Sequence, residues 1–321
     1  MRAAFYDRIG PAADVLRVEE IDRPTPGPGE VLVRVAVSGV NPTDVKSRAG
    51  VTPRPIQGFQ VPHQDGSGVI EVVGDGVEGG RVGERVWLWM AAVGRWGTAA
   101  QWCVVPAEQA VPLDGTASDS LGACLGVPAM TAHRCLFADG PLDGAAVLVA
   151  GGAGAVGHYA IELARRAGAR VAATVSSDEK AELARAAGAD LVVNYRRQDA
   201  LEVLKDFSSV MDRIVEVNLP VNLDIDLALS GPSTTVVTYA STGTDPTLPI
   251  RRCMGANISF RFVLLYGVPR SSLLAAASDI AVAAGDGTLS ELPLHRYSLD
   301  EIVAAHEAVE AGAVGKVVVV P

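Results

Sequence analysis

The sequence predicts an α/β protein made of a β-rich part and a doubly wound parallel sheet. Up to about residue 116, the chain is rich in Gly and Pro and contains short runs that alternate apolar and polar residues, as half-buried strands do. Between about residues 145 and 240, continuous apolar runs alternate with amphipathic runs, which is typical of buried parallel strands joined by helices. The length of 321 residues suits about two domains, at about 150 residues each.

The first third of the chain is expected to form short antiparallel strands. Turn residues separate the candidates, and many short strands divided by turns are typical of a barrel or sandwich. The candidate strands are residues 31–40, 66–74, 84–89 and 99–106.

The middle of the chain is expected to form the parallel sheet, after an Ala- and Leu-rich helical segment at 117–137. Strands are predicted at 145–150, 170–175, 191–194, 212–218 and 234–240, with helices at 158–168 and 177–189 between them. Beyond about 260, two more helices and a final strand follow, at 271–287, 300–312 and 315–321. Residues 117–259 are therefore assigned to one domain, and residues 1–116 to another that 260–321 completes.

Composition excludes several classes of protein. There are 27 Lys and Arg residues against 37 Asp and Glu, a net charge of 27 − 37 = −10, which argues against nucleic-acid binding through bulk charge. No apolar stretch is long enough for a membrane span, and no signal-peptide pattern is evident, so a soluble cytoplasmic protein is expected. The cysteines lack CxxC spacing and are expected to be reduced and mostly buried: Cys103, Cys124, Cys135 and Cys253.

One glycine motif indicates a dinucleotide site. Gly152, Gly154 and Gly157 form a GxGxxG pattern that a buried strand enters and an amphipathic helix leaves. The first glycine permits a tight turn, the second lets backbone approach a pyrophosphate, and the third lets helix and strand pack closely. The pyrophosphate would rest on the helix N-terminus, beside Ala155 and Val156. This context predicts a Rossmann-type domain.

The end of the next strand bears on the choice between NAD and NADP. An acid often occupies this corner in NAD-binding folds, where it binds the ribose 2′-hydroxyl. Here Ser176 follows the strand, with Ser177 and Lys180 nearby, so no acid at the corner would repel a 2′-phosphate. Asp178 and Glu179 are interpreted as first-turn helix charges, with Ser176 and Glu179 forming a capping box.

The chain resembles the zinc-free quinone oxidoreductase (zeta-crystallin-like) branch of the medium-chain dehydrogenase/reductase superfamily. The resemblance covers nearly the whole chain and rests on the order of SGVNPTDVKSRAG, DGSGVIEVVGDGV, GERVW, GTAAQWCVVP, LGVPAMTAHRCL, AGGAGAVG and AHEAVEAGAVGKVVVV. It implies that the β-rich part is a GroES-like catalytic domain, interrupted by the Rossmann domain. It also implies a homodimer, with residues 259–265 as the edge that pairs.

The resemblance also implies that no catalytic metal is bound. The three ligand positions of the zinc enzymes fall on Asn41, on Gln64 and near Val127, and none carries a matching residue type. His63 is shifted from the ligand position by one residue and is interpreted as a turn histidine. The remaining histidines are scattered through the sequence without ligand spacing.

For the cofactor, the resemblance implies NADPH, with Ser176, Lys180 and Tyr195 around the 2′-phosphate. It places Thr131 beside the cofactor, and residues 238–241 and 264–266 in loops over the pyrophosphate and nicotinamide. The motif and the resemblance together give these cofactor-binding residues: Thr131, Gly152, Gly154, Ala155, Val156, Gly157, Ser176, Ser177, Lys180, Tyr195, Asn218, Tyr239, Ser241, Leu264, Leu265, Tyr266 and Lys316.

For catalysis, the resemblance implies the NPxD segment, with Asn41 and Asp44. Asp44 is assigned either to chemistry or to ordering of the loop. Two residues later Lys46 replaces a tyrosine common among relatives, and Thr52 replaces a second one. The substrate pocket is therefore expected to be more polar than that of many relatives, and Lys46 either faces the substrate or points to solvent.

These observations favour NADPH-dependent hydride transfer to a quinone or similar conjugated carbonyl. Reduction of enoyl or other α,β-unsaturated carbonyl compounds is the first alternative, and it needs a proton donor, for which Lys46 and Tyr266 are candidates. The second alternative is an NADPH-binding protein with a structural or regulatory role and little turnover.

Overall fold

The computed structural model describes residues 1–241 and 243–321, which form two compact units. The first unit consists of Met1–Val127 and Ala277–Pro321, and the second of Pro128–Ala276. The first unit extends beyond residue 116 because helix α3 (Asp119–Cys124) packs against its sheet. Ser67 Oγ donates to the carbonyl of Asp119 at 2.6 Å, which fixes the start of this helix to the sheet.

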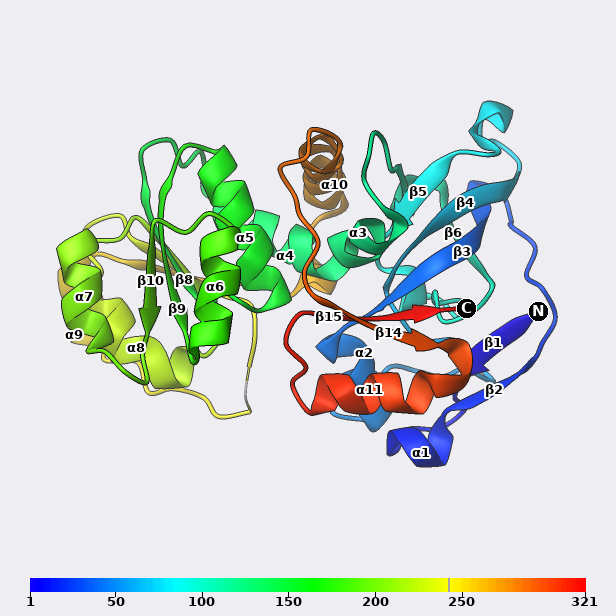
Figure 1. Cartoon of the computed structure of the whole chain (residues 1–321), viewed down its shortest axis with the longest axis horizontal. Coiled ribbons are helices and arrows are strands. Elements are labelled where there is room, and N and C mark those ends of the chain that lie inside the picture. Colours follow the sequence, from blue (N-terminus) through cyan, green and yellow to red (C-terminus); the bar gives the residue numbers. More distant parts are fainter. Residues whose placement is uncertain (242) are drawn as a thin grey trace. The chain divides into compact units, whose positions relative to one another are not determined.

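A seven-stranded sheet forms the centre of the first unit (Figure 1). Its order is β14-β15-β3-β4-β5-β7, with β6 paired to β3, and its pairs are antiparallel apart from the parallel pair β14–β15. The strands are β3 (Glu30–Val40), β4 (Asp65–Val73), β5 (Arg85–Leu88), β6 (Trp102–Pro106), β7 (Ala110–Pro112), β14 (Leu294–Ser298) and β15 (Lys316–Val320). This confirms a separate β-rich part, and β14 and β15 of the C-terminal segment belong to its sheet.

Smaller elements surround this sheet. A separate antiparallel ribbon consists of β1 (Arg2–Phe5) and β2 (Arg17–Glu20). The helices are α1 (Ala12–Val15), α2 (Pro42–Ala49), α3, the C-terminal part of α10 (Arg270–Gly285) and α11 (Ile302–Glu310). Short 3₁₀ turns occur at η1 (Gly79–Arg81), η2 (Ala91–Val93), η3 (Ala107–Gln109) and η6 (Leu299–Glu301).

Three neighbouring strands of the first sheet have ends that lie side by side. Val40, the last residue of β3, pairs with Val317 of β15, and Gly39 pairs with Asp65, the first residue of β4. Residues 41, 65 and 316 therefore lie close together at the same end of these strands. Asn41 begins helix α2, and Pro42 supplies a first helical position that needs no backbone N–H.

The second unit contains a parallel sheet of order β10-β9-β8-β11-β12-β13. Its strands are β8 (Ala146–Ala150), β9 (Arg170–Val175), β10 (Leu191–Asn194), β11 (Arg213–Glu216), β12 (Thr235–Thr238) and β13 (Ser259–Phe262). From β8 the chain progresses outward in one direction to β10 and then in the other to β13. This reversal gives a doubly wound sheet, because right-handed crossovers in opposite directions place helices on opposite faces.

Helices connect the parallel strands as expected. They are α5 (Ala155–Arg166), α6 (Asp178–Ala186), α7 (Ala200–Phe207), α8 (Leu219–Ala228) and α9 (Ile250–Ala256), while α4 (Met130–Phe137) precedes the first strand, β8. A wider π-type turn, η4 (Leu125–Ala129), precedes α4, and a 3₁₀ turn, η5 (Leu265–Gly267), follows β13. The expected capping box of Ser176 and Glu179 is wrong by one residue: Ser177 caps α6 and accepts from Lys180 N at 3.3 Å.

Burial follows the predicted pattern. All five residues of β8 are buried, as a central parallel strand requires.

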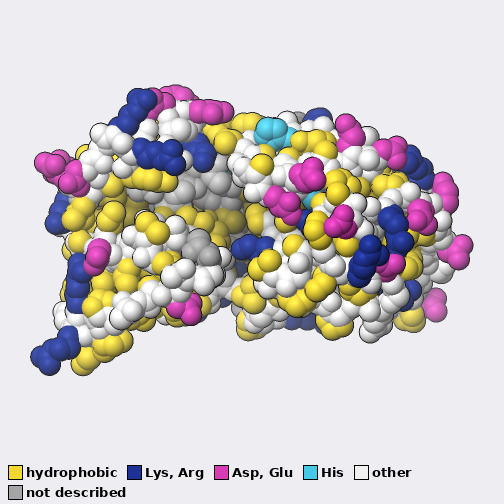
Figure 2. Space-filling model, turned by 90° about the horizontal axis from the view of Figure 1, so that it is seen from below, with side chains coloured by type: hydrophobic (Ala, Val, Ile, Leu, Met, Phe, Trp, Pro, Cys, Tyr) yellow, Lys and Arg dark blue, Asp and Glu magenta, His cyan; other side chains and the backbone are white. Residues whose placement is uncertain are grey.

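On the face in Figure 2, Lys and Arg side chains are scattered among Asp and Glu side chains. The four cysteines carry free thiols, and three of them are buried. Across residues 1–241 and 243–321, the structure contains no helix with the length and apolar character to cross a membrane.

Candidate functional site

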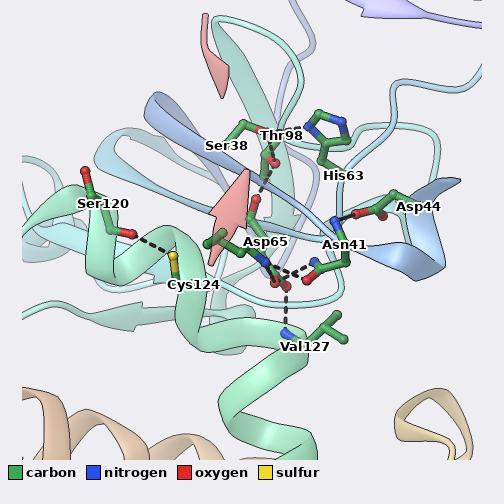
Figure 3. Close-up of polar contacts among 10 residues, drawn as sticks. Ser38, Asn41, Asp44, His63, Asp65, Thr98, Ser120, Cys124 and Val127 are labelled. Atoms are coloured by element: carbon green, nitrogen blue, oxygen red, sulfur yellow. Dashed lines mark hydrogen bonds and ion pairs between the residues drawn. The ribbon is translucent and has the colours of Figure 1, made fainter. Parts of the chain in front are cut away.

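Three buried polar side chains lie at the ends of β3, β4 and β15. We call them the Asn41 cluster: Asn41, Asp65 and Lys316. Asn41 Nδ2 donates to Asp65 Oδ2 at 2.7 Å (Figure 3), and Lys316 Nζ donates to Asn41 Oδ1 at 2.6 Å. The same ammonium lies 3.5 Å from Asp65 Oδ2 and forms an ion pair with it. All three side chains are buried, so each bond lies in a region of low dielectric constant where it is strengthened.

The cluster fixes the orientation of the Asn41 amide. An ammonium can only donate and a carboxylate can only accept, so Oδ1 faces Lys316 and Nδ2 faces Asp65. An amide nitrogen carries two hydrogens, and the bond to Asp65 uses one of them. The second hydrogen is suited to a carbonyl or hydroxyl oxygen of a bound ligand.

Asp65 was not among the residues predicted from the sequence. Its Oδ1 accepts from Val127 N at 2.8 Å, and a Cβ on Gly126 would lie 2.2 Å from Oδ1, so only glycine permits this approach. Burial raises the pKa of Asp65, whereas the charge of Lys316 and the bond from Asn41 oppose that rise. The only sequence signal was its position next to Gln64 in the HQDGSG segment.

Asp44 and Lys46, the other predicted catalytic residues, both lie on α2. Asp44 is buried, and its Oδ2 accepts from Asn41 N at 2.9 Å, which closes the first turn of the helix (Figure 3). Burial raises the pKa of Asp44 to about 7, and the nearby charge of Asp65 adds to this rise. The contact supports the loop-ordering interpretation of Asp44. Lys46 is half-buried, and its catalytic role stays a prediction.

Two of the three positions that would carry zinc ligands make contacts with Asp65 instead. Asn41 is held within its cluster, and Val127 contributes a backbone N–H to Asp65. Gln64 is buried, and its Oε1 accepts no hydrogen bond from the described residues. Among residues 1–241 and 243–321, no three His, Cys, Asp or Glu side chains are grouped so that they could hold a metal ion.

His63 is more than a turn histidine. Its φ of 77° is turn-like, but its side chain is buried and contacts His306, with 3.0 Å between the two Nε2 atoms. Thr98 Oγ1 donates to the Asp65 carbonyl at 2.5 Å, so Ser38 Oγ donates to Thr98 at 2.7 Å and accepts from His63 Nδ1 at 2.8 Å. His306 must then donate to His63, and sequence spacing gave no sign of this pair.

The glycine turn of the second unit packs as tightly as predicted. A Cβ on Gly157 would lie 2.4 Å from the carbonyl oxygen of Gly151, and one on Gly152 would lie 2.8 Å from the Cβ of Ala173. The left-handed backbone of the turn belongs to Gly151, with a φ of 71°. Gly154 is the N-cap residue of α5 and is exposed, as backbone that meets a ligand should be.

Three residues expected at the 2′-phosphate converge at one edge of the second sheet. Lys180 Nζ donates to Ser176 Oγ at 3.3 Å, and the backbone N of Tyr195 bonds to the carbonyl of Val175 at 3.1 Å. The strands β9 and β10 are neighbours, so their carboxyl ends place Ser176 and Tyr195 close together. Half of the Tyr195 side chain is exposed, at 52%, and is therefore accessible.

The acid of this region is engaged elsewhere. Asp178 Oδ1 accepts from Asn194 Nδ2 at 2.9 Å, and its Oδ2 forms a 2.5 Å ion pair with Arg197. Arg197 offsets the charge of Asp178 in this exposed ion pair, and Arg197 was not singled out from the sequence. Its signal was the Arg pair directly after Tyr195.

The other predicted cofactor residues mostly follow carboxyl ends of the parallel strands, where open α/β sheets bind ligands. Asn218 follows β11, Tyr239 and Ser241 follow β12, and Leu264 to Tyr266 follow β13, while Thr131 is buried in α4. Leu264 is exposed, whereas Leu265 is buried. Lys316 belongs to the first unit and donates to Asn41. Contact of these residues with a cofactor stays a prediction.

Comparison with known protein families matches both units. Residues 27–115 match the alcohol dehydrogenase GroES-like domain, and residues 155–281 match the zinc-binding dehydrogenase family. The human quinone oxidoreductase is 29% identical over 324 residues, which cover 99% of this chain and 97% of that protein. A 2-haloacrylate reductase of Burkholderia sp. is 36% identical over 236 residues, which cover 70% of this chain and 69% of that protein.

A solved structure agrees with these relatives. A mycobacterial protein complexed with NADPH superposes with a TM-score of 0.85 at 27% identity, and the match covers all of both chains. Two family models, full-length relatives and this fold therefore agree with the motifs in the sequence. The chain belongs to the quinone oxidoreductase branch of the medium-chain dehydrogenase/reductase superfamily.

Proposed function

We propose that this protein transfers a hydride from NADPH to a quinone or a related conjugated carbonyl compound. The observation that carries the proposal is the group formed by Ser176, Lys180 and Tyr195 at the carboxyl edge of the second sheet. It offers one cation and two hydroxyls, and the nearby Asp178 is already paired with Arg197. Such a group suits a phosphate and distinguishes NADPH from NADH. The NADPH complex of the mycobacterial relative supports the same cofactor.

The residues of the second unit fit the rest of a dinucleotide. Gly154 begins α5 with extended backbone, so the N–H groups of Ala155 and Val156 are at the helix N-terminus, where they can meet a pyrophosphate. NADPH supplies the hydride when it is bound; the protein binds and orients it. Gly157 keeps α5 close to β8, which holds these N–H groups in place.

The Asn41 cluster supplies the polar group proposed to meet the acceptor. The amide orientation set by Asp65 and Lys316 leaves one Asn41 Nδ2 hydrogen for a carbonyl oxygen. A donor at that oxygen stabilises the negative charge that grows on it during hydride transfer. Holding Asn41 in advance means that little reorganisation is needed during the reaction.

Reduction of an α,β-unsaturated carbonyl is the second candidate activity. The Burkholderia relative is named for a halogenated acrylate, which belongs to this class of compound, and it is 36% identical to this chain. This reaction needs a proton at the α-carbon after hydride transfer, whereas a reduced quinone needs no carbon protonation. Lys46 and Tyr266 are the candidate donors.

Oxidation of NADPH at 340 nm separates the candidates. We expect turnover with 9,10-phenanthrenequinone and 1,4-benzoquinone. Turnover only with 2-chloroacrylate, enals or enoyl thioesters would replace the quinone proposal with the second candidate. Tight NADPH binding without turnover on either panel would favour a structural or regulatory role instead.

We also propose that the protein is a homodimer formed through β13. This strand ends the six-stranded sheet, so one of its edges has no neighbour among the described strands, and Phe262 on it is 69% exposed. An exposed edge strand readily pairs with another chain. Light scattering should give twice the 33.2 kDa mass. Ser259 N and Val263 N bond to β12, so the N–H of Phe262 points to the free edge, and Phe262→Pro should give monomers.

A further inference from the structure

Two carboxyl side chains of the second unit lie buried against each other. Glu216 ends β11 and is 0% exposed, and Asp226 in α8 is 1% exposed. A hydrogen bond links the two carboxyl groups. A carboxylate only accepts, so this bond requires that one of the two groups carry a proton.

Asp226 is the group that carries the proton. Burial, followed by the charge of Glu216, raises the pKa of Asp226 to about 9. Glu216 accepts from Asn222 Nδ2, at 2.9 Å to Oε1 and 3.1 Å to Oε2, and its Oε1 also accepts from Asn218 N. These donors favour the carboxylate form of Glu216. Asp226 Oδ2 has no partner among the described residues, so an ionised Asp226 would be poorly compensated.

The pair lies directly behind the glycine turn. Strand β11 is the neighbour of β8, with Val215 opposite Val149. After Glu216 the chain turns at Val217, whose Cγ1 lies 3.2 Å from the position that a Cβ on Gly151 would take. The bond from Asn218 N to Glu216 closes this turn. Movement of Glu216 would therefore displace the backbone that contacts the glycine turn.

Charged groups on the packed neighbours do not neutralise the pair. Arg252 of α9 bonds to the exposed Asp224 of α8, at 2.9 Å. Arg213, at the other end of β11, pairs with Asp139. Tyr239, after β12, is in electrostatic range of Glu216, and burial raises the pKa of Tyr239 above its ordinary value. Tyr239 is thus neutral over the range in which Asp226 titrates.

We propose that Asp226 and Glu216 share one proton and, through it, hold the Val217–Asn218 turn as a wall of the NADPH site. They act as positioning residues: loss of the proton drives the two carboxylates apart and weakens cofactor binding. This inference rests on the proposed function, since it needs NADPH at the glycine turn.

The test measures the dissociation constant of NADPH by tryptophan-fluorescence quenching between pH 7 and pH 10. Asp226→Asn keeps a donor to Glu216 but cannot ionise, and Asp224→Asn, on the 93%-exposed residue of the same helix, is the control. At pH 7 both variants should bind within about threefold of the wild type. The ratio of the wild-type constant to the Asp226→Asn constant should rise about tenfold by pH 10, one unit above the value for Asp226.

The ratio cancels any pH effect that all variants share. Asp226→Leu, which removes the donor, should bind NADPH weakly at every pH while circular dichroism shows a folded protein. Equal pH profiles for the wild type and Asp226→Asn would overturn the proton-sharing proposal and leave NADPH binding intact. A wild type that does not bind NADPH at pH 7 would overturn the proposed function as well.

Discussion

Lys180 is the residue that most directly decides cofactor choice. Its ammonium lies beside Ser176, and a charged hydrogen bond to phosphate contributes roughly 1.5–3 kcal/mol. Lys180→Ala should therefore raise the apparent constant for NADPH roughly tenfold or more and leave that for NADH nearly unchanged. Initial-rate kinetics with both cofactors measure this, with Lys205→Ala on the exposed face of α7 as the control. Equal losses for both cofactors would assign Lys180 to folding.

Substitution of Lys46 tests whether this side chain contributes to the site of the hydride acceptor. It lies on the helix that Asn41 begins, and it is half-buried. Removing a donor to a developing oxyanion costs about 10²–10³ in turnover, and a partly solvated lysine should cost less. We expect Lys46→Met to lower quinone turnover about tenfold without changing NADPH binding, and Lys46→Tyr to restore part of it. Unchanged turnover in Lys46→Met would remove Lys46 from the site.

Asp44 predicts a pH dependence of stability. Its pKa is about 7 in the folded protein against 3.8 ordinarily, so between these values the folded state keeps a proton that the unfolded chain has released. The free energy of unfolding must therefore fall as pH rises from 4 to 7, by up to about 4 kcal/mol from this group.

Asp44→Asn should abolish that contribution. Urea titrations at pH 4.5, 5.5 and 7 would show a smaller decrease for Asp44→Asn than for the wild type. Asp75→Asn, at an exposed carboxylate of the same unit, should follow the wild type. A variant with an undiminished slope would show that Asp44 is ionised throughout this range.

The glycine turn and α5 depend on one another as elements. Gly157→Ala would place a Cβ 2.4 Å from the carbonyl oxygen of Gly151, so α5 must move away from β8. Gly154→Ala places its Cβ at an ordinary 3.4 Å from the same atom. Thermal melts and NADPH titrations should show lower Tm and lost binding for Gly157→Ala. Gly154→Ala should keep its Tm, and a melting loss as large as that of Gly157→Ala would contradict this account.

Elements with local signals were predictable from the sequence, whereas pairs across the chain were not. The apolar run of β8, the glycines after it and the helix α5 lie within some twenty residues. One short sequence pattern therefore predicts both the local structure and the dinucleotide site. The predicted start of helix α6 was one residue too early, because Ser176 and Ser177 are both good N-cap residues. His306 and Asp226 had no signal in the sequence, and Asp65 had only its position next to Gln64, because burial and distant partners define these residues.

At the level of the whole protein, the residues at the ligand positions predict independence from zinc. Asn41, Gln64 and Val127 provide two amides and an apolar side chain, none of which is a common zinc ligand. Elemental analysis of the purified protein should find well below one zinc per chain, and EDTA should leave quinone turnover unchanged. Stoichiometric zinc with activity lost to the chelator would contradict this prediction.

The position of Lys316 has a consequence for biosynthesis. Its partner Asn41 precedes it by 275 residues, and β15, which it begins, lies between β14 and β3. A ribosome releases the N-terminal strands and the whole second unit before it releases this lysine. The second unit can therefore fold during translation, as domains commonly do. The amide of Asn41 receives its ammonium partner only after synthesis reaches the last strand, so a truncated chain would lack this bond.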